Sequence, residues 1–479
     1  MGSATRRGGG VSRRETLAML AAVGVSSACH AQSPGDASIF RPEEYGARGD
    51  GRTNDTAAFA ALSAALNRRG GGTVVLRKTV YVVGAQRHDP GNDAYLLAPQ
   101  PILAFIGCPD DVVIEGNGAT LRSASGLRYG VFDPGTRRSF NPKLPFYERK
   151  SRAAPYEAMV RAERCRGRMV IRDLVLDGNV DTMILGGRWG DSGWQIAGSG
   201  IVLQNNAGAE IIENVVCRNH PLDGIMIDGV PYTPDVVRRL RNVVMDRNGR
   251  QGCSIVGGGG YVFENCQFSR TGRGPLGSAP GAGVDIEPEN ESRVRNLRFT
   301  GCRFSDNAGP GLLTGGQGSS DVTCVGSVFA GTTAWAAWPN APRYRFRDCT
   351  FIGATSNCYG DSNPAEATLF EGCTFTDVPP ADGPTRIFLG DPAGGPIVDV
   401  SSAPNVRFST CTFTLRGSGR LPWSTAAIYD SCTMEQRSAT TAYPRGRWSG
   451  RSVVRGKVDI GGSTIAGSLI VNGTTVSRT

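Results

Sequence analysis

Three acidic side chains occur at the second or fourth position after the glycine in two short, glycine-led segments in the middle of the sequence. The segments are GIMID at Gly224–Asp228 and GVDIE at Gly283–Glu287. Alternate residues of a β-strand point to opposite faces, so Asp228, Asp285 and Glu287 should share the outer face. Asp285 and Glu287 would then lie roughly 6.5–7 Å apart along one strand, with Asp228 about 9.6 Å away across two stacked strands. Carboxylates at such distances raise one another's pKa or share a cation.

β-Elimination on a uronate-containing polysaccharide is the chemistry that we favour for this cluster. A base removes the proton next to the uronate carboxylate, and the charge of that carboxylate must be neutralised. The three acids would hold Ca²⁺ as the metal ligands. His220, Arg250 and Arg273, on neighbouring turns, are the candidates for base and charge clamp. His220 is the better base because arginine normally stays protonated, and Asp223 is expected to contact the substrate.

Two other interpretations of the same residues remain open. An inverting glycoside hydrolase needs two carboxyl groups roughly 6.5–9.5 Å apart, and Asp228 with Asp285 or Glu287 would meet that distance. Outward positions of a solvated sheet are also normally polar, which is compatible with a non-catalytic glycan-binding or surface protein. Under either enzymatic interpretation, Asp285→Asn or Glu287→Gln should abolish cleavage while the fold persists.

A repeated eight-residue pattern, apolar-x-apolar-x-x-Cys-x-apolar, must position these residues. Copies follow one another mostly at 21 to 28 residues, and at longer intervals where a loop is inserted. This period predicts stacked coils that bury a shared core, as in a parallel β-helix. Two outward columns follow from aligning the glycine-led strands: Val202, Met226, Ser254, Asp285 and Leu313, and then Gln204, Asp228, Val256, Glu287 and Gly315. The clearest copies are YVFENCQF (Tyr261–Phe268), LRFTGCRF (Leu297–Phe304), YRFRDCTF (Tyr344–Phe351), TLFEGCTF (Thr368–Phe375), VRFSTCTF (Val406–Phe413) and AIYDSCTM (Ala427–Met434).

The cysteines of these copies hold one equivalent inward position. Stacking would place their thiols in a buried column about 4.8 Å apart. We expect free thiols rather than disulfides, because small polarizable side chains pack well there. A metal cluster is not expected, since the sequence has no Cys-x-x-Cys pair. The members are Cys266, Cys302, Cys349, Cys373, Cys411 and Cys432, with Ser327 in the same place.

Residues 1–31 have the features of an export signal. Ser12–Leu17 resembles a twin-arginine motif, and the apolar run Leu17–Val25 is too short to span a bilayer. We therefore expect a periplasmic or extracellular protein without a transmembrane segment, with a lipid anchor at Cys29 as one option. The formal charge of +9 becomes 48 minus 42, or +6, once four Arg and one Glu of this segment are removed. This mild excess suits an anionic partner.

An N-terminal cap is expected over residues 32–110. Apolar residues from Ala58 to Leu66 recur at helical spacing, with Asn54 or Asp55 as the helix cap and Gly70–Gly72 at its end. The segments YGARGDGRTNDTAAFAAL, GGGTVVL and VVIEGNGATL resemble the start of pectate-lyase-superfamily proteins, a group of polysaccharide lyases, polygalacturonase-type hydrolases and phage tailspikes. The resemblance implies an all-β, single-stranded, right-handed parallel β-helix with a capping helix. The coil region lacks the Asn-Thr-Asp, Asp-Asp, Gly-His-Gly and Arg-Ile-Lys motifs of the polygalacturonase type.

The β-helix itself is expected over 111–445, with a final coil or end cap at 446–479. Two insertions, 123–156 and 178–199, carry the residues expected to bind substrate, unless the first is only a solvated lip over the barrel. Cations with interleaved aromatic rings can hold an anionic sugar chain by charge and stacking. We expect a monomer that binds an anionic polysaccharide and no nucleic acid. The candidate binding residues are Arg137, Arg138 and Lys143 in the first insertion and Trp189 and Trp194 in the second.

Overall fold

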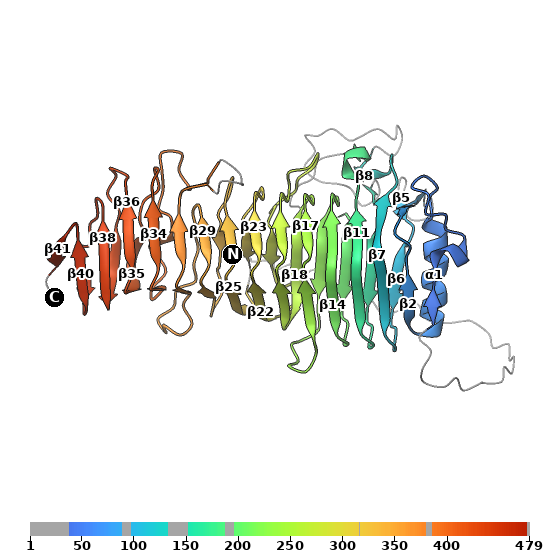
Figure 1. The fold of residues 1–479 in the computed structure, drawn as a ribbon, viewed down its shortest axis with the longest axis horizontal. Coiled ribbons are helices and arrows are strands. Elements are labelled where there is room, and N and C mark those ends of the chain that lie inside the picture. Colours follow the sequence, from blue (N-terminus) through green and yellow to red (C-terminus); the bar gives the residue numbers. More distant parts are fainter. Residues whose placement is uncertain are drawn as a thin grey trace, which may run out of the picture. The chain divides into compact units, whose positions relative to one another are not determined.

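Parallel strands on three faces form the coils of this chain, and the coils stack into a right-handed parallel β-helix (Figure 1). The computed structural model describes residues 38–88, 97–132, 152–186, 196–315, 317–379 and 386–476. These residues belong to one compact unit, Ser38–Thr479. The predicted fold class is therefore confirmed, whereas the expected export segment lies outside the described residues.

The strands of successive coils pair in parallel and form three faces. The first face contains β2 (Gly72–Val75), β16 (Arg238–Arg241), β19 (Tyr261–Glu264), β22 (Val294–Thr300), β25 (Ser319–Val325), β28 (Arg345–Arg347), β30 (Leu369–Glu371), β33 (Arg407–Ser409), β37 (Pro444–Ser449) and β39 (Thr464–Ile465). The second contains β3 (Val80–Val83), β17 (Val244–Asp246), β20 (Gln267–Ser269), β23 (Arg303–Ser305), β26 (Val328–Ala330), β29 (Thr350–Ile352), β31 (Thr374–Thr376), β34 (Thr412–Leu415), β36 (Thr433–Gln436), β38 (Arg451–Arg455) and β40 (Ser468–Val471). Three longer strands run through both faces: β7 (Val112–Ser123), β11 (Met169–Asp177) and β14 (Glu210–Arg218).

The third face carries the candidate site. It contains β6 (Leu103–Ile106), β10 (Ala158–Glu163), β13 (Ser199–Gln204), β15 (Asp223–Asp228), β18 (Gln251–Gly259), β21 (Val284–Ile286), β24 (Leu312–Thr314) and β27 (Ala337–Trp338). Farther along, β32 (Asp399–Val400) pairs with the start of β35 (Trp423–Asp430), and β41 (Thr474–Val476) closes the last coil against β40 in an antiparallel hairpin. The stack therefore continues through β40 to the hairpin that ends at Val476.

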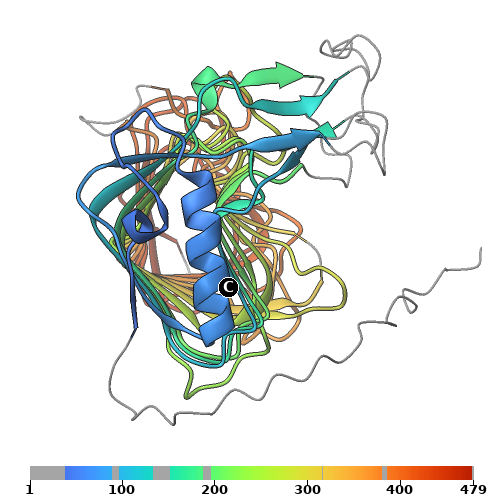
Figure 2. The same ribbon diagram turned by 90° about the vertical axis from the view of Figure 1, so that its right-hand side faces the viewer.

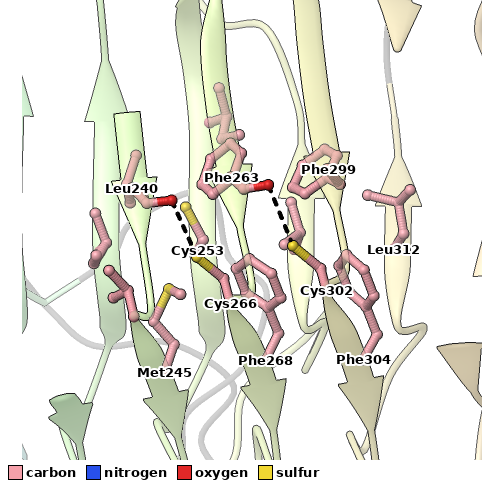
Figure 3. Packing of buried hydrophobic residues seen from close by; sticks show 14 of the residues in the cluster. Leu240, Met245, Cys253, Phe263, Cys266, Phe268, Phe299, Cys302, Phe304 and Leu312 are labelled. Atoms are coloured by element: carbon pink, nitrogen blue, oxygen red, sulfur yellow. Dashed lines mark hydrogen bonds between the residues drawn. The ribbon is translucent and has the colours of Figure 1, made fainter. Parts of the chain in front are cut away.

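Identical residue types stack on one another inside the coils. The rings of Phe263 and Phe299 lie 4.5 Å apart at their centroids and are nearly parallel, and those of Phe268 and Phe304 lie 4.8 Å apart. Between the two rows, the thiol of Cys302 donates to the main-chain oxygen of Phe263 at 3.5 Å (Figure 3). Register between coils is therefore fixed by shape, because a slip of one residue would move every ring to the outer side.

The prediction of free, buried thiols is confirmed for the described cysteines, which are all buried and unpaired by disulfides. Each of the repeat thiols donates to a carbonyl oxygen of the preceding coil, as Cys266 does to Leu240 at 3.4 Å. Ser327 makes the same bond to Phe299 at 3.4 Å. A small donor is therefore what this position requires, and sulfur or oxygen can supply it.

The chain passes from the first face to the second through a single left-handed residue. Asn214, Asn242 and Asn265 occupy this position with φ between 53° and 54°. Asparagine tolerates this conformation better than most residues, and here the side chains also link the coils. The amide of Asn242 donates to Asn214 at 3.0 Å, and that of Asn214 donates to Asp173 at 3.0 Å.

Helix α1 (Thr56–Arg69) lies across the open end of the coils (Figure 2). Phe59, Leu62 and Leu66 are fully buried, which covers apolar surface that the first coil would otherwise expose. Of the two residues predicted to cap the helix, Asp55 holds the N-cap position without a side-chain cap bond, and Oδ1 of Asn54 accepts the main-chain N–H of Thr56 at 3.0 Å. Short elements η1 (Pro42–Tyr45) and β1 (Ile39–Phe40) precede the helix.

Both predicted insertions contribute to a small second sheet beside the coils. Its order is β12 (Ile184–Gly186), β8 (Arg128–Val131), β9 (Arg152–Ala153), β5 (Leu97–Pro99) and β4 (Gln86–His88). The 3₁₀ turn η3 (Val180–Thr182) precedes β12. No helix in the described ranges is long and apolar enough to cross a membrane.

Candidate functional site

The register of the third face confirms the first predicted outward column. Met226 of β15 pairs with Ser254 of β18, which pairs with Asp285 of β21 and then with Leu313 of β24. The isoleucines that alternate with them, such as Ile225 and Ile227, are fully buried. Acids and hydroxyls from separate coils are therefore brought to one face.

The second predicted column is interrupted by a β-bulge. Asp228 pairs with Gly257 instead of Val256, because the register shifts after Ile227. The glycines that follow permit this irregularity, since a Cβ on Gly258 would come within 2.7 Å of Gly229. The alignment of Asp228 with Val256 was therefore wrong.

Asp223 and Arg250 form the charged centre of the third face. Oδ2 of Asp223 lies 3.9 Å from a terminal nitrogen of Arg250, and Asp223 is 2% exposed. Burial raises the pKa of Asp223 to about 6, although the charge of Arg250 and the main-chain N–H of Gln251 act in the opposite direction. Among the described residues, neither Oδ1 of Asp223 nor Nε of Arg250 has a hydrogen-bond partner. The cluster thus holds an acceptor and a donor that the fold leaves unused.

Gln251 extends this cluster to the next coil. It pairs directly with Asp223 in the sheet, and its side-chain amide donates to Oδ2 of Asp285. Gln251, Ser254 and Asp285 are at most 2% exposed, so these polar side chains are shielded from solvent. Glu289 is exposed, and its charge contributes to the raised pKa of Asp223. The cluster therefore approaches solvent on the side of Glu289.

The three carboxylates proposed as calcium ligands do not converge. Asp228 accepts from Gln204 on the preceding coil at 3.1 Å, Asp285 is bound to Gln251, and Glu287 is exposed beyond the end of β21. Across the part of the chain that the structure describes, no three His, Cys, Asp or Glu side chains are grouped to hold a metal ion. These residues do not fit a calcium site, and no step of the chemistry is assigned to one.

His220 lies inside the coils, which corrects its proposed placement at the edge of the site. Its Nδ1 lies 2.9 Å from the hydroxyl of Tyr156, and its Nε2 lies 3.2 Å from the main-chain oxygen of Leu176. Since a carbonyl only accepts, Nε2 carries the proton and Nδ1 accepts from Tyr156. The side chain is fully buried, and burial lowers its pKa to about 4. Both ring nitrogens are therefore already bonded inside the coils, and neither is placed to take a proton from a polysaccharide.

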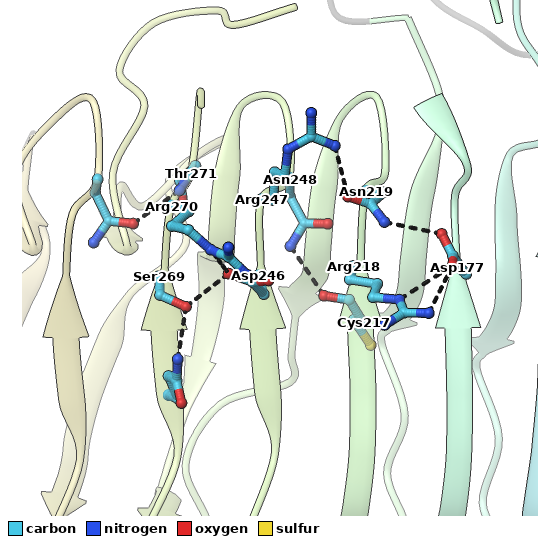
Figure 4. Close-up of polar contacts among 12 residues, drawn as sticks. Asp177, Cys217, Arg218, Asn219, Asp246, Arg247, Asn248, Ser269, Arg270 and Thr271 are labelled. Carbon is cyan, nitrogen blue, oxygen red and sulfur yellow. Dashed lines mark hydrogen bonds and ion pairs between the residues drawn. The ribbon is translucent and has the colours of Figure 1, made fainter. Parts of the chain in front are cut away.

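The turns between the second and third faces carry an internal row of polar side chains, seen from the side in Figure 4. Asn248 accepts the main-chain N–H of His220 at 3.1 Å and donates to the main-chain oxygen of Cys217 at 3.2 Å. On the outer side of these turns, Arg270 forms an ion pair with Asp246, and Arg218 pairs with Asp177 at 2.9 Å. The hydrogen bonds of Asn248 connect successive turns and fix the position of the start of β15, which carries Asp223, relative to the neighbouring coils.

Arg273 is held by these turns and not by the Asp223 cluster. Its guanidinium lies 3.2 Å from Asp306 and donates to the hydroxyls of Thr332 and Thr333, each at 3.0 Å. The structure therefore brings together Asp223, Arg250 and Asp285 from the predicted set. Arg137, Arg138, Lys143, Trp189 and Trp194 lie outside the described residues.

Gln251 is the member of the site that the sequence analysis did not assign a role. The signal for it was available, because Gln251 precedes Gly252 as Asp223 precedes Gly224. The aligned columns started after the glycine and so omitted this position.

A match to a family model supports the fold. Residues 192–351 match the model of the right-handed β-helix region, and no curated protein matches the sequence. The chain is similar to the A-module of a mannuronan C-5 epimerase from Azotobacter vinelandii, with 20% identity, 92% of this chain and 100% of that chain covered, and a TM-score of 0.44. It is also similar to the N-terminal fragment of gene product 12 of bacteriophage Phi29 (14% identity, 91% and 72% covered, TM-score 0.49). A third similar structure is tailspike gp49 of Acinetobacter baumannii bacteriophage Fri1, a capsular polysaccharide depolymerase. Its identity is 13%, with 92% of this chain and 65% of that chain covered and a TM-score of 0.39.

Proposed function

We propose that this right-handed β-helix protein processes an acidic polysaccharide on the outer side of its third face, by β-elimination next to a uronate carboxylate. The observation that carries the proposal is the unpartnered pair of atoms, Oδ1 of Asp223 and Nε of Arg250. A buried polar atom without a partner costs about 1–3 kcal/mol. A substrate that supplies both partners would recover this free energy.

Asp223 is the proposed base. Its pKa of about 6 leaves it mostly ionised at neutral pH yet able to take up a proton. The carboxylate would accept the proton next to the uronate carboxyl group. The electron pair of that C–H bond would form the new double bond as the bond to the leaving oxygen breaks, and water would protonate that oxygen.

Arg250 is the proposed charge clamp. A guanidinium binds a carboxylate through two parallel N–H groups, and its charge would stabilise the negative charge that develops when the proton leaves. The 3.9 Å distance between Asp223 and Arg250 is longer than a direct hydrogen bond. This leaves the arginine with donors to offer a substrate.

Asp285 and Gln251 are proposed to hold the substrate in register. Their hydrogen bond links the coil of Arg250 to the next coil, so a sugar chain lying along the stack would meet polar groups on consecutive coils. We also propose export of the protein through residues 1–31, with the twin-arginine motif and a possible lipid acceptor at Cys29 as the features that support it.

The proposal is tested by incubating the purified protein with a panel of acidic and neutral polysaccharides. Absorbance of the unsaturated uronate product, together with new reducing ends, would support β-elimination. Reducing ends without that absorbance would mean hydrolysis, and binding without either product would mean a non-catalytic glycan-binding protein. Arg250→Gln should lower turnover at least about 100-fold if it stabilises developing charge. Glu287→Gln is the control: the sequence alone predicted a loss of cleavage for this variant, but the side chain is exposed beyond the end of β21.

A further inference from the structure

A second polar region follows the turns that lead from the third face to the first face. Three hollows of 430, 540 and 380 Å³ lie there in succession. The first and second share Arg293 and Arg295, and the second and third share Arg343. The hollows are therefore contiguous. We call them the arginine groove, defined by Tyr232, Arg293, Arg295, Arg298, Arg343 and Arg345.

The arginine groove has an excess of positive charge. Five arginines line it against two acids, Glu291 and Asp321, which gives a net charge of +3 for the lining. Asp321 is already paired with Arg343 at 2.5 Å. Arg293 and Arg295 are exposed, and neither makes an ion pair or side-chain hydrogen bond within the described ranges. These two guanidinium groups are therefore available to an anion.

The groove continues into a regular column of arginines on the first face. Arg239, Arg298, Arg345, Arg407 and Arg447 occupy the same outward register position. A residue without charge separates each pair, as Thr323 separates Arg298 from Arg345. Two coils therefore separate consecutive arginines, a spacing of about 9.6 Å. Arg239 and Arg407 are already paired with Glu213 at 3.5 Å and Asp430 at 2.8 Å. The column as a whole suits a polymer that lies along the stack and carries widely spaced negative charges.

The spacing favours an acidic polysaccharide over a nucleic acid. Phosphates follow one another about every 3.4 Å along one strand of DNA, which is far denser than the arginine column. The remaining lining is rich in amide and hydroxyl side chains, including Gln317, Ser320 and Asn340, which are partners for sugar hydroxyls. Tyr232 is 42% exposed and lies against Gly260, where a Cβ would come within 2.4 Å of its ring. A ring held this way offers a flat surface for a sugar.

We propose that the arginine groove is a second binding site for an acidic polysaccharide, separate from the Asp223 cluster. The substrate class rests on the proposed function, whereas the site rests on the arginines of the groove. The groove would hold one part of the polysaccharide along the stack while another part of the same polysaccharide molecule occupies the third face.

The test compares the double variant Arg293→Ala/Arg295→Ala with Arg451→Ala/Arg455→Ala, which removes the same charge from exposed arginines of the second face. Binding of a purified polyuronate, a neutral polysaccharide and single-stranded DNA is measured by calorimetry at two salt concentrations. The groove variant should bind the polyuronate about tenfold more weakly, with a smaller salt dependence. In a cleavage assay its KM should rise while kcat is unchanged.

Each other outcome decides a separate point. Unchanged polyuronate binding by the groove variant would overturn the arginine groove even if the wild-type protein cleaves the polymer. Polyuronate binding that depends on Arg293 and Arg295 without any cleavage would support the groove and remove the proposed lyase. Tighter binding of DNA, lost in the groove variant and kept in the control, would overturn the assignment to a polysaccharide. An equal loss of polyuronate affinity in both variants would mean that binding depends only on the net charge of the protein, which would overturn the site.

Discussion

The side-chain nitrogen of Asn248 lies so close to Gly224 on the preceding coil that a Cβ at Gly224 would come within 2.6 Å of it. The same relationship recurs between Gly200 and His220, and between Gly283 and Asn307. At these three strands the leading glycine is therefore explained by packing: it makes room for the polar side chain of the next turn and for the main chain of the next coil. Asp223 and Gln251 stand directly before the leading glycines of β15 and β18, at the first position of their strands.

Gly224→Ala should destabilise the protein by about 1–3 kcal/mol, the usual cost of forcing an extra methyl group into a packed interior. Gly315→Ala is the matched control, because a Cβ there would meet nothing within 4 Å. Thermal unfolding of the two variants measures the difference. An equal and small effect of both substitutions would mean that Asn248 can move aside, and would contradict the packing explanation.

The parts of the fold that depend on periodicity could be predicted from the sequence. The cysteine column and the outward column through Ser254 and Asp285 both follow from a repeat that fixes inward and outward positions. The predicted alignment after Asp228 was wrong because a single bulge adds one residue, which reverses the inward and outward positions that follow it. Alternation carries no information on where such an irregularity occurs.

The candidate site was harder to predict because turn residues have no fixed direction. His220 and Asp223 are three positions apart, yet His220 points into the core and Asp223 packs against Arg250 on the outer side. Burial then gives the two groups opposite pKa shifts. The composition of the turn indicated polar residues near the site but not which of them faced the substrate.

Cys302→Ser should cost less than about 1.5 kcal/mol, since Ser327 makes the equivalent bond on the next coil. Cys302→Leu should cost about 1–3 kcal/mol, because a larger side chain would press on Phe263 and Phe299 (Figure 3). Urea unfolding distinguishes the two variants. A loss of stability from serine as large as that from leucine would show that sulfur itself, and not its size and donor, is required.

Asp223→Asn should stabilise the protein at pH 7 while it abolishes cleavage. Burial raises the pKa of Asp223 from 3.8 to about 6, so the charged carboxylate is disfavoured in the folded state above pH 6. The cost of this shift is about 2–3 kcal/mol at pH 7 and disappears as the pH falls below 3.8. Asparagine has no charge and avoids it. Urea unfolding at pH 7 and pH 5 measures the gain, and a gain that does not shrink at pH 5 would contradict the mechanism.

The titration of His220 should change the unfolding free energy with pH in the direction opposite to that of Asp223. Its pKa is about 4 in the folded protein against 6.5 for an ordinary histidine, so between these values the unfolded chain binds a proton that the folded chain does not. The unfolding free energy therefore falls as the pH drops from 6.5 to 4, by about 1.4 kcal/mol per pH unit for this single proton. Asp223 opposes this slope in the wild-type protein.

The contribution of His220 to the pH dependence of the unfolding free energy is best isolated in the Asp223→Asn variant. The variant to compare with it is Asp223→Asn/His220→Gln. The unfolding free energy of the single variant should fall more steeply between pH 6.5 and 4 than that of the double variant, by up to one proton. The double variant should also be less stable at pH 7, because the bonds of His220 to Tyr156 and Leu176 are lost or weakened. Parallel pH profiles would mean that the ring of His220 reaches solvent, which would restore it as a candidate base.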